Sequence, residues 1–202
     1  MKAIVVRQPW ATLIALGVKT IETRPGPPNG PMRPDGVRGL PGCRLERGER
    51  IAIVAGATPP EVGLRLGTDA PITTSEFLVS EGWRLLDLCN EVAHPLPLGA
   101  VVCTVMVDDA LPIVDDLGGP EDPLPRICNP EPVWPLRIMR PFTYPSEPIT
   151  DQLPLGDFTP GRWGYMMVEP IPVNAIPCKG RQGIFKLPQE VEHAVCESGA
   201  HL

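Results

Sequence analysis

The sequence is poor in aromatic residues and has no long apolar run. Aromatic residues make up 5% of the 202 residues, so the core must be mostly aliphatic. A membrane-spanning helix needs roughly 18 consecutive apolar residues, and no such run is present. The apolar stretch between Lys2 and Arg7 is too short for a signal peptide. We therefore predict an intracellular, cytoplasmic protein whose cysteines are reduced.

Several motifs that carry known chemistry are missing. The six cysteines form no C-x-x-C pair and the histidines do not stand at metal-ligand spacing, so we predict no metal site and no cofactor. The three histidines, at 94, 193 and 201, fall in predicted loop or tail positions, and no serine–histidine–acid set is visible. No glycine-rich segment lies between a strand and a helix, which argues against phosphoryl transfer.

Proline, in contrast, is abundant. The chain has 28 prolines, where average usage would give roughly ten. Proline interrupts helices and central strands, so we expect short elements joined by long irregular loops. Short apolar runs at uneven spacing, separated by turn residues, favour a small β-barrel flanked by short helices. The predicted fold class is α+β.

Apolar runs and turn residues place these elements along the chain. We predict strands at 3–6, 18–24, 50–55, 99–107, 133–139, 162–168 and 182–187, an extended segment at 171–177, and helices from Pro9 to the residue before Gly17 and over 76–90. Residues 1–188 would form a single domain with loop insertions at about 25–48, 56–74 and 108–160. The tail over 189–202 would be a short helix or frayed.

Charge is unevenly distributed. Residues 1–50 contain nine Lys or Arg and four Asp or Glu, a net charge of +5, although the whole chain carries −6. A basic N-terminal quarter on an acidic body would provide a local patch for a polyanion. The acidic loops have the simpler explanation that they keep the protein in solution.

Residues 7–24, RQPWATLIALGVKTIETR, gather charged residues that suggest a site. In a strand, Thr20, Glu22 and Arg24 share one face while Ile21 points to the other. Glu22 and Arg24 would form an exposed ion pair worth about 0–1 kcal/mol, or they would contact a phosphate or a base edge. Lys19, just after the helix, would complement the helix C-terminus, contact an anion, or act as a nucleophile or base if buried.

Trp10 and the basic residues near the C-terminus each have two interpretations. Trp10 would pack the first helix on the barrel or provide a stacking surface for a base. Arg162, Lys179, Arg181 and Lys186 make the C-terminal strands basic. If those strands pack beside the first helix, these residues and the N-terminal basic residues would form one surface; otherwise they are scattered surface charges.

The segment 7–24 resembles the start of the ASCH domain, named for activating signal cointegrator homology. That family has Q-P-W-A, a helix and then G-x-K-x-x-E-x-R, which residues 8–11 and 17–24 match. Residues 49–55, 97–105, 161–165 and 180–186 resemble later strands of the family. The resemblance implies a PUA-like fold, a small β-barrel flanked by helices with a cleft beside the first helix, and a role with nucleic acids or nucleotides.

The ASCH family also includes small amidohydrolases that act on N4-acetylcytidine. In those enzymes this segment supplies a catalytic Lys and, three residues on, a Thr, and a Glu comes from a later helix. Lys19 matches the catalytic Lys, while Glu22 stands at the position of the Thr.

These observations lead to three hypotheses. The first is an ASCH-like module that binds RNA, single-stranded nucleic acid or a modified nucleotide in a cleft beside the first helix. Its binding residues would be Arg7, Trp10, Lys19, Glu22, Arg24, Arg162 and Arg181. The alternative is an amidohydrolase of N4-acetylcytidine-like nucleosides, in which Lys19 activates Thr20, Thr23 or water and Glu22 moves protons. The third is a protein-interaction module that presents the Pro-rich loops to a partner. No membrane partner is expected.

Overall fold

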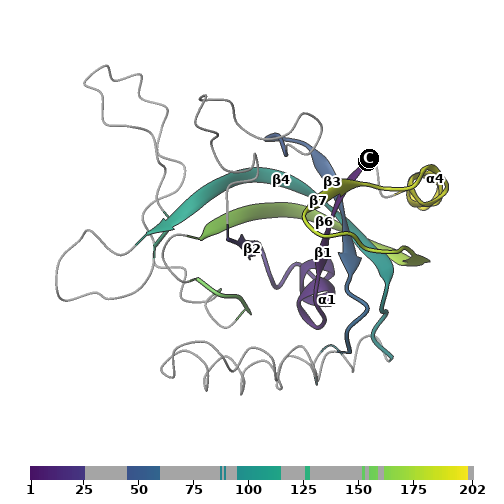
Figure 1. Cartoon of the computed structure of the whole chain (residues 1–202), viewed down its shortest axis with the longest axis horizontal. Coiled ribbons are helices and arrows are strands. Elements are labelled where there is room, and N and C mark those ends of the chain that lie inside the picture. The colour runs from purple at the N-terminus through teal and green to yellow at the C-terminus, as the bar shows by residue number, and fades with distance from the viewer. Residues whose placement is uncertain are drawn as a thin grey trace.

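The computed structural model describes residues 1–25, 45–59, 87, 89, 95–114, 126–127, 152, 155–158 and 162–199 (Figure 1). The strands are β1 (Lys2–Val6), β2 (Ile21–Arg24), β3 (Arg50–Ala55), β4 (Ala100–Val114), β5 (Arg126–Ile127), β6 (Trp163–Pro177) and β7 (Ile184–Lys186), and the helices are α1 (Trp10–Ala15) and α4 (Gln189–Glu197). Six strands form one sheet in the order β2–β6–β4–β3–β1–β7, and β5 pairs with β4. Among these strands β1 and β3 are parallel, and the other pairs are antiparallel.

The sheet is curled and buries apolar side chains on both faces. Figure 1 shows β4 and β6 as long strands that run side by side and bend, with α1 inside the curve and α4 outside it. We name these the α1 face and the α4 face. Alternate residues of β3 point to opposite faces, so Ile51 and Ile53 join the core of the α1 face, and Ala52 and Val54 join that of the α4 face. Burial on both faces explains the continuous apolar run of this strand.

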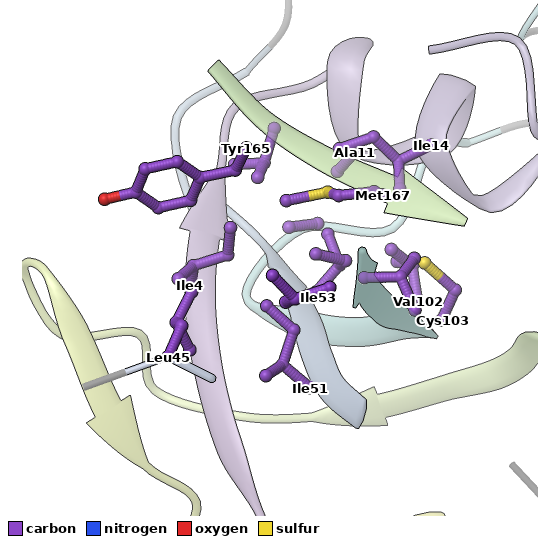
Figure 2. Close-up of a cluster of buried hydrophobic side chains, with 14 residues drawn as sticks. Ile4, Ala11, Ile14, Leu45, Ile51, Ile53, Val102, Cys103, Tyr165 and Met167 are labelled. Carbon is purple, nitrogen blue, oxygen red and sulfur yellow. The ribbon is translucent and has the colours of Figure 1, made fainter. Parts of the chain in front are cut away.

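The core of the α1 face is the larger of the two and is shown in Figure 2. It joins α1 to four strands through Ile4, Val6, Ala11, Ile14, Leu45, Ile51, Ile53, Ala55, Val102, Cys103, Val105, Val107, Tyr165 and Met167. Tyr165 lies at the margin of this cluster, and its hydroxyl points away from the other labelled side chains (Figure 2). Tyr165 therefore marks the border between the apolar core of the α1 face and the polar groups beside it.

A buried side chain holds the start of α1. Gln8 is 1% exposed, and its Oε1 accepts hydrogen bonds from the backbone N–H of Thr12 at 3.1 Å and from Thr12 Oγ1 at 3.0 Å. Gln8 Nε2 donates to the carbonyl oxygen of Pro97 at 2.9 Å. The amide thus satisfies an N–H of the first turn that has no partner within the helix, and it ties α1 to the segment that leads into β4.

Gly17 ends α1, as predicted, and turns the chain toward β2. Its φ of +73° favours glycine. The N–H of Gly17 donates to Ile14 O at 2.9 Å and the N–H of Val18 donates to Leu13 O at 2.9 Å. This pair of hydrogen bonds is the Schellman motif. Because the N–H of Lys19 also donates to Leu13 O, at 3.1 Å, this turn fixes the position of Lys19 between α1 and β2.

The two longest strands differ from the predictions. We predicted a strand over 99–107 and a loop from 108, but β4 continues to Val114 because its residues from Asp109 to Pro112 pair with the first residues of β6. We predicted two segments at 162–168 and 171–177, but they form one strand. Glu169, with φ of 50°, allows the bend between them. Arg50 holds this bend by donating to Glu169 O at 3.0 Å and to its carboxylate at 3.2 Å.

Other predicted elements have mixed outcomes. The sheet is curled like part of a barrel, but within the described residues its edge strands β2 and β7 are not paired with each other. The predicted tail forms α4, whose Val191 and Val195 are buried against the sheet. Of the helix predicted over 76–90, the structure describes only Asp87 and Cys89, both helical, and the strand over 133–139 lies outside the described residues. Most of the predicted Pro-rich loops also lie outside them, and the domain limits at 1–188 remain a prediction.

Candidate functional site

The pairing of β2 with β6 sets the direction of the charged side chains. Glu22 lies opposite Tyr165 and Arg24 lies opposite Trp163. Directly opposed residues of an antiparallel pair share a face, so Glu22 and Arg24 share the α1 face with these aromatic residues. Ile21 points to the other face, where it is buried with Ile113 and Phe158. The predicted alternation along β2 is thus confirmed, but the charged side chains face the inside of the curl.

Lys19 is the largest of the buried polar side chains among the described residues, with 2% of its surface exposed. Its ammonium group donates to the carbonyl oxygens of Ile21 and of Leu155, the latter at 2.7 Å. It also lies 3.4 Å from Glu22 Oε2. A lysine ammonium has three donors, so these partners use all of them. In this arrangement Lys19 is a fixed internal cation.

Residues far along the chain supply further contacts at and beside Lys19. Gln152 accepts a hydrogen bond from the N–H of Thr20 at 2.9 Å and donates to Val18 O at 3.2 Å. Its side-chain amide thereby takes the place of a neighbouring strand along the chain that leads into β2. Leu155, three residues later, supplies the carbonyl oxygen that binds Lys19. The sequence contained no signal for these contacts, because they join residues more than 130 positions apart.

Arg24 connects β2 to β1 across the open side of the sheet. Its Nη2 lies 3.0 Å from Glu22 Oε1 and donates to the carbonyl oxygen of Val5. Because β2 is one edge of the sheet and β1 adjoins the other edge, Arg24 bridges the gap that strand pairing leaves. Its Nε is buried and has no hydrogen-bond partner among the described residues. Lys19, Glu22 and Arg24 are together named the charged junction.

Burial dominates the electrostatics of the charged junction. It lowers the pKa of Lys19 from the ordinary value of 10.5; Glu22 raises it and Arg24 lowers it further. Burial also raises the pKa of Tyr165 to about 12, with a lowering effect of Arg24 and a raising effect of Glu22. The Tyr165 hydroxyl therefore keeps its proton at neutral pH. A carboxylate, two cations and a phenol thus meet at one end of the α1 face.

The lowered pKa of Lys19 predicts a pH dependence of stability. Lys19 holds its proton more weakly in the folded chain than in the unfolded chain, where its pKa is near 10.5. Between these two values the unfolded chain binds more protons, so the free energy of unfolding should rise with pH. Urea unfolding from about pH 7 to about pH 10 should show this rise in the wild type and a flatter curve for Lys19→Met. Parallel curves would contradict the prediction.

The remaining predicted residues lie in different surroundings. Thr23 is buried, and a Cβ placed on Gly156 would lie 3.4 Å from Thr23 Oγ1 and 3.2 Å from Lys19 Nζ, so both groups border one small space. Arg162 pairs with Asp157 at 3.2 Å and donates to Thr23 O at 3.3 Å. These contacts hold Arg162 beside the backbone of β2 and next to Asp157, and it is not part of the group formed by Lys19, Glu22 and Arg24.

Three further predicted residues lie nearer the surface. Trp10 is half-buried and packs against the core of the α1 face and against a smaller cluster around Leu13. Arg7 and Arg181 are exposed. The group of three or more acidic, histidine or cysteine side chains that a metal site needs does not occur within the described residues. The helices of that part of the chain are also too short or too polar to cross a membrane.

Comparison with known proteins finds similar solved structures. No protein-family model and no curated protein sequence matches the chain. The ASCH protein of Zymomonas mobilis is 12% identical with a TM-score of 0.41, covering 97% of this chain and 93% of its own. The first of two single-substitution variants of that protein is 12% identical with a TM-score of 0.41, and the match covers 97% of this chain and 96% of the variant. The second is 11% identical with a TM-score of 0.39, and the match covers 97% of this chain and 94% of the variant. All three are ASCH domain proteins, the family that the motifs of this sequence resemble.

Proposed function

We propose that the chain is an ASCH-like module of PUA-like fold that binds RNA, another single-stranded nucleic acid or a modified nucleotide at the charged junction. The observation that carries the proposal is the state of Arg24. Its side chain is 27% exposed and is held by Glu22; its Nε, like that of Arg162, is buried without a hydrogen-bond partner among the described residues. A ligand that accepts hydrogen bonds from the exposed part of the Arg24 guanidinium would gain about 1.5–3 kcal/mol for each bond.

The neighbours of Arg24 support a nucleic acid rather than a simple anion. Single-stranded nucleic acids offer phosphates, base edges and flat base faces to a protein. Arginine binds phosphate or acceptor groups of a base, and a carboxylate accepts hydrogen bonds from a base amine. Trp163 is half-buried and lies opposite Arg24 on the same face, where an aromatic ring is a suitable stacking partner for a base. The charged junction and Trp163 thus offer a cation for phosphates, hydrogen-bonding groups for base edges and an aromatic ring for stacking, all on the α1 face.

Direct binding measurements test this function. Fluorescence anisotropy with a labelled single-stranded RNA should give saturable binding that weakens as salt rises from about 50 mM to about 200 mM. A single-stranded DNA of the same sequence and a double-stranded RNA would show which form is preferred. Failure to bind any of these, and also failure to bind cytidine or N4-acetylcytidine, would refute the proposal.

Hydrolysis of an acylated nucleoside is the second candidate function. It is favoured by Lys19 and Thr23 bordering the same small space at Gly156, which gives a buried amine close to a hydroxyl. Because the ammonium donors of Lys19 are all in use, this chemistry requires one of its present partners to move. Incubation of the same sample with N4-acetylcytidine tests it. Turnover by the wild type that is lost in both Lys19→Met and Thr23→Val would make the chain an enzyme. No turnover by the wild type would leave a binding module.

A further inference from the structure

Two further parts of the chain lie close to Val5, the residue of β1 that binds Arg24. Arg24 binds the carbonyl oxygen of Val5. A Cβ on Gly180 would lie 2.6 Å from Val5 Cγ2, so the turn between β6 and β7 lies directly against the side chain of the same residue. Arg7 follows two residues after Val5, which is roughly 7 Å along an extended chain. Val5 therefore links the three: its carbonyl oxygen binds Arg24 of the junction, its side chain, which packs in the core of the α4 face, touches the turn, and Arg7 follows it along the chain.

The turn and Arg7 together present three exposed cations. Lys179, Arg181 and Arg7 are all exposed. Within the described part of the chain none of the three forms an ion pair. Arg181 and Glu190 of α4 both lie close to the Cys178 thiol: burial raises the pKa of that thiol, Arg181 lowers it and Glu190 raises it. The turn thus places Arg181 close to α4 and, through Gly180, against β1.

We propose that Arg7, Lys179 and Arg181, here named the basic rim, bind the phosphate backbone of a single-stranded polynucleotide while one of its nucleotides occupies the charged junction. This inference rests on the proposed function and narrows its ligand from a free nucleotide to a chain. Exposed, unpaired cations neutralise phosphates and release counterions, which strengthens binding without sequence preference. The missing side chain of Gly180 allows the turn to approach β1 closely enough for the rim and the junction to serve one ligand.

Neutralising the basic rim tests this inference. The variant Arg7→Gln/Lys179→Gln/Arg181→Gln should bind a single-stranded RNA about tenfold or more weakly, and the slope of log affinity against log salt should fall by about 2, because each lost phosphate contact removes about 0.7 for a single strand. Its affinity for a mononucleotide should remain that of the wild type. Single-stranded DNA should show the same change in slope, because it carries the same phosphates.

Lys186 provides a matched control. It is an exposed lysine on β7, but it pairs with Lys2 at the opposite end of β1. Lys186→Gln should therefore leave the affinity and the salt slope unchanged. The inference would be overturned if the triple variant kept the wild-type slope of log affinity against log salt. It would also be overturned if Lys186→Gln lost as much RNA affinity per charge as the triple variant. If binding then still depends on Arg24, the proposed function stands without the rim; if binding is absent altogether, both fail.

Discussion

Replacing Glu22 with glutamine is expected to lower the free energy of unfolding by about 3–5 kcal/mol, because removing one member of a buried ion pair leaves the other charge uncompensated. Lys19 is only 2% exposed, and Glu22 is its only anionic partner among the described residues. Without the carboxylate, Lys19 either stays charged beside Arg24 or gives up its proton, and both outcomes stabilise the unfolded chain relative to the folded one. The deficit should therefore shrink as the pH rises toward the ordinary lysine pKa of 10.5.

Urea unfolding monitored by circular dichroism measures this loss, and two variants calibrate it. Glu49→Gln removes one partner of Lys2, in an ion pair of 2.8 Å whose side chains are 18% and 25% exposed, and should cost only about 0–1 kcal/mol. Lys19→Met/Glu22→Gln should recover part of the loss, because replacing both buried charges by groups without net charge is often close to neutral. If the double variant is as unstable as the sum of the single ones, the two charges do not act as a pair.

The elements that carry local signals were predicted well. The buried strands β1 and β3 follow from short runs of aliphatic residues, and α1 follows from its apolar face and from Gly17. In β2 the alternation of Ile21 with its charged neighbours predicts correctly which side chains share a face. These features depend on residues only a few positions apart, so local spacing is enough to specify them.

The surroundings of the candidate site could not be predicted in the same way. The carbonyl oxygen of Leu155 binds buried Lys19 and Gln152 binds the backbone on either side of it, and nothing in the composition near 150 indicates that pairing. The charges of β2 left open whether that face is exposed or lines a site, and the curl of the sheet turns it toward Tyr165 and the core. Propensity likewise failed for the end of β4, where pairing with β6 overrides an acidic sequence. Each of these features depends on a contact between distant segments, which single-sequence patterns do not contain.

Replacing Arg24 with methionine is expected to weaken the binding of single-stranded RNA by roughly 10- to 100-fold, which corresponds to the loss of about 1.5–3 kcal/mol for hydrogen bonds from a charged group. Arg24→Lys should lose most of the same affinity, because an ammonium cannot hold Glu22, Val5 O and a ligand with one planar group. The salt slope separates two roles: a phosphate contact predicts a fall of about 0.7 for a single strand, whereas a contact with a base edge leaves the slope unchanged and alters base preference.

Arg50 makes the decisive comparison for Arg24, because it is held in the same way elsewhere. It donates to the carbonyl oxygen of Glu169 at 3.0 Å and to its carboxylate at 3.2 Å, and its side chain is 13% exposed. Arg50→Met should therefore lower stability much as Arg24→Met does, while RNA binding stays at the wild-type level. Equal losses of binding in the two variants would mean that Arg24 acts only by joining β2 to β1. A loss confined to Arg24→Met would support a ligand contact at the charged junction, because each arginine joins two strands through a carboxylate and a carbonyl oxygen.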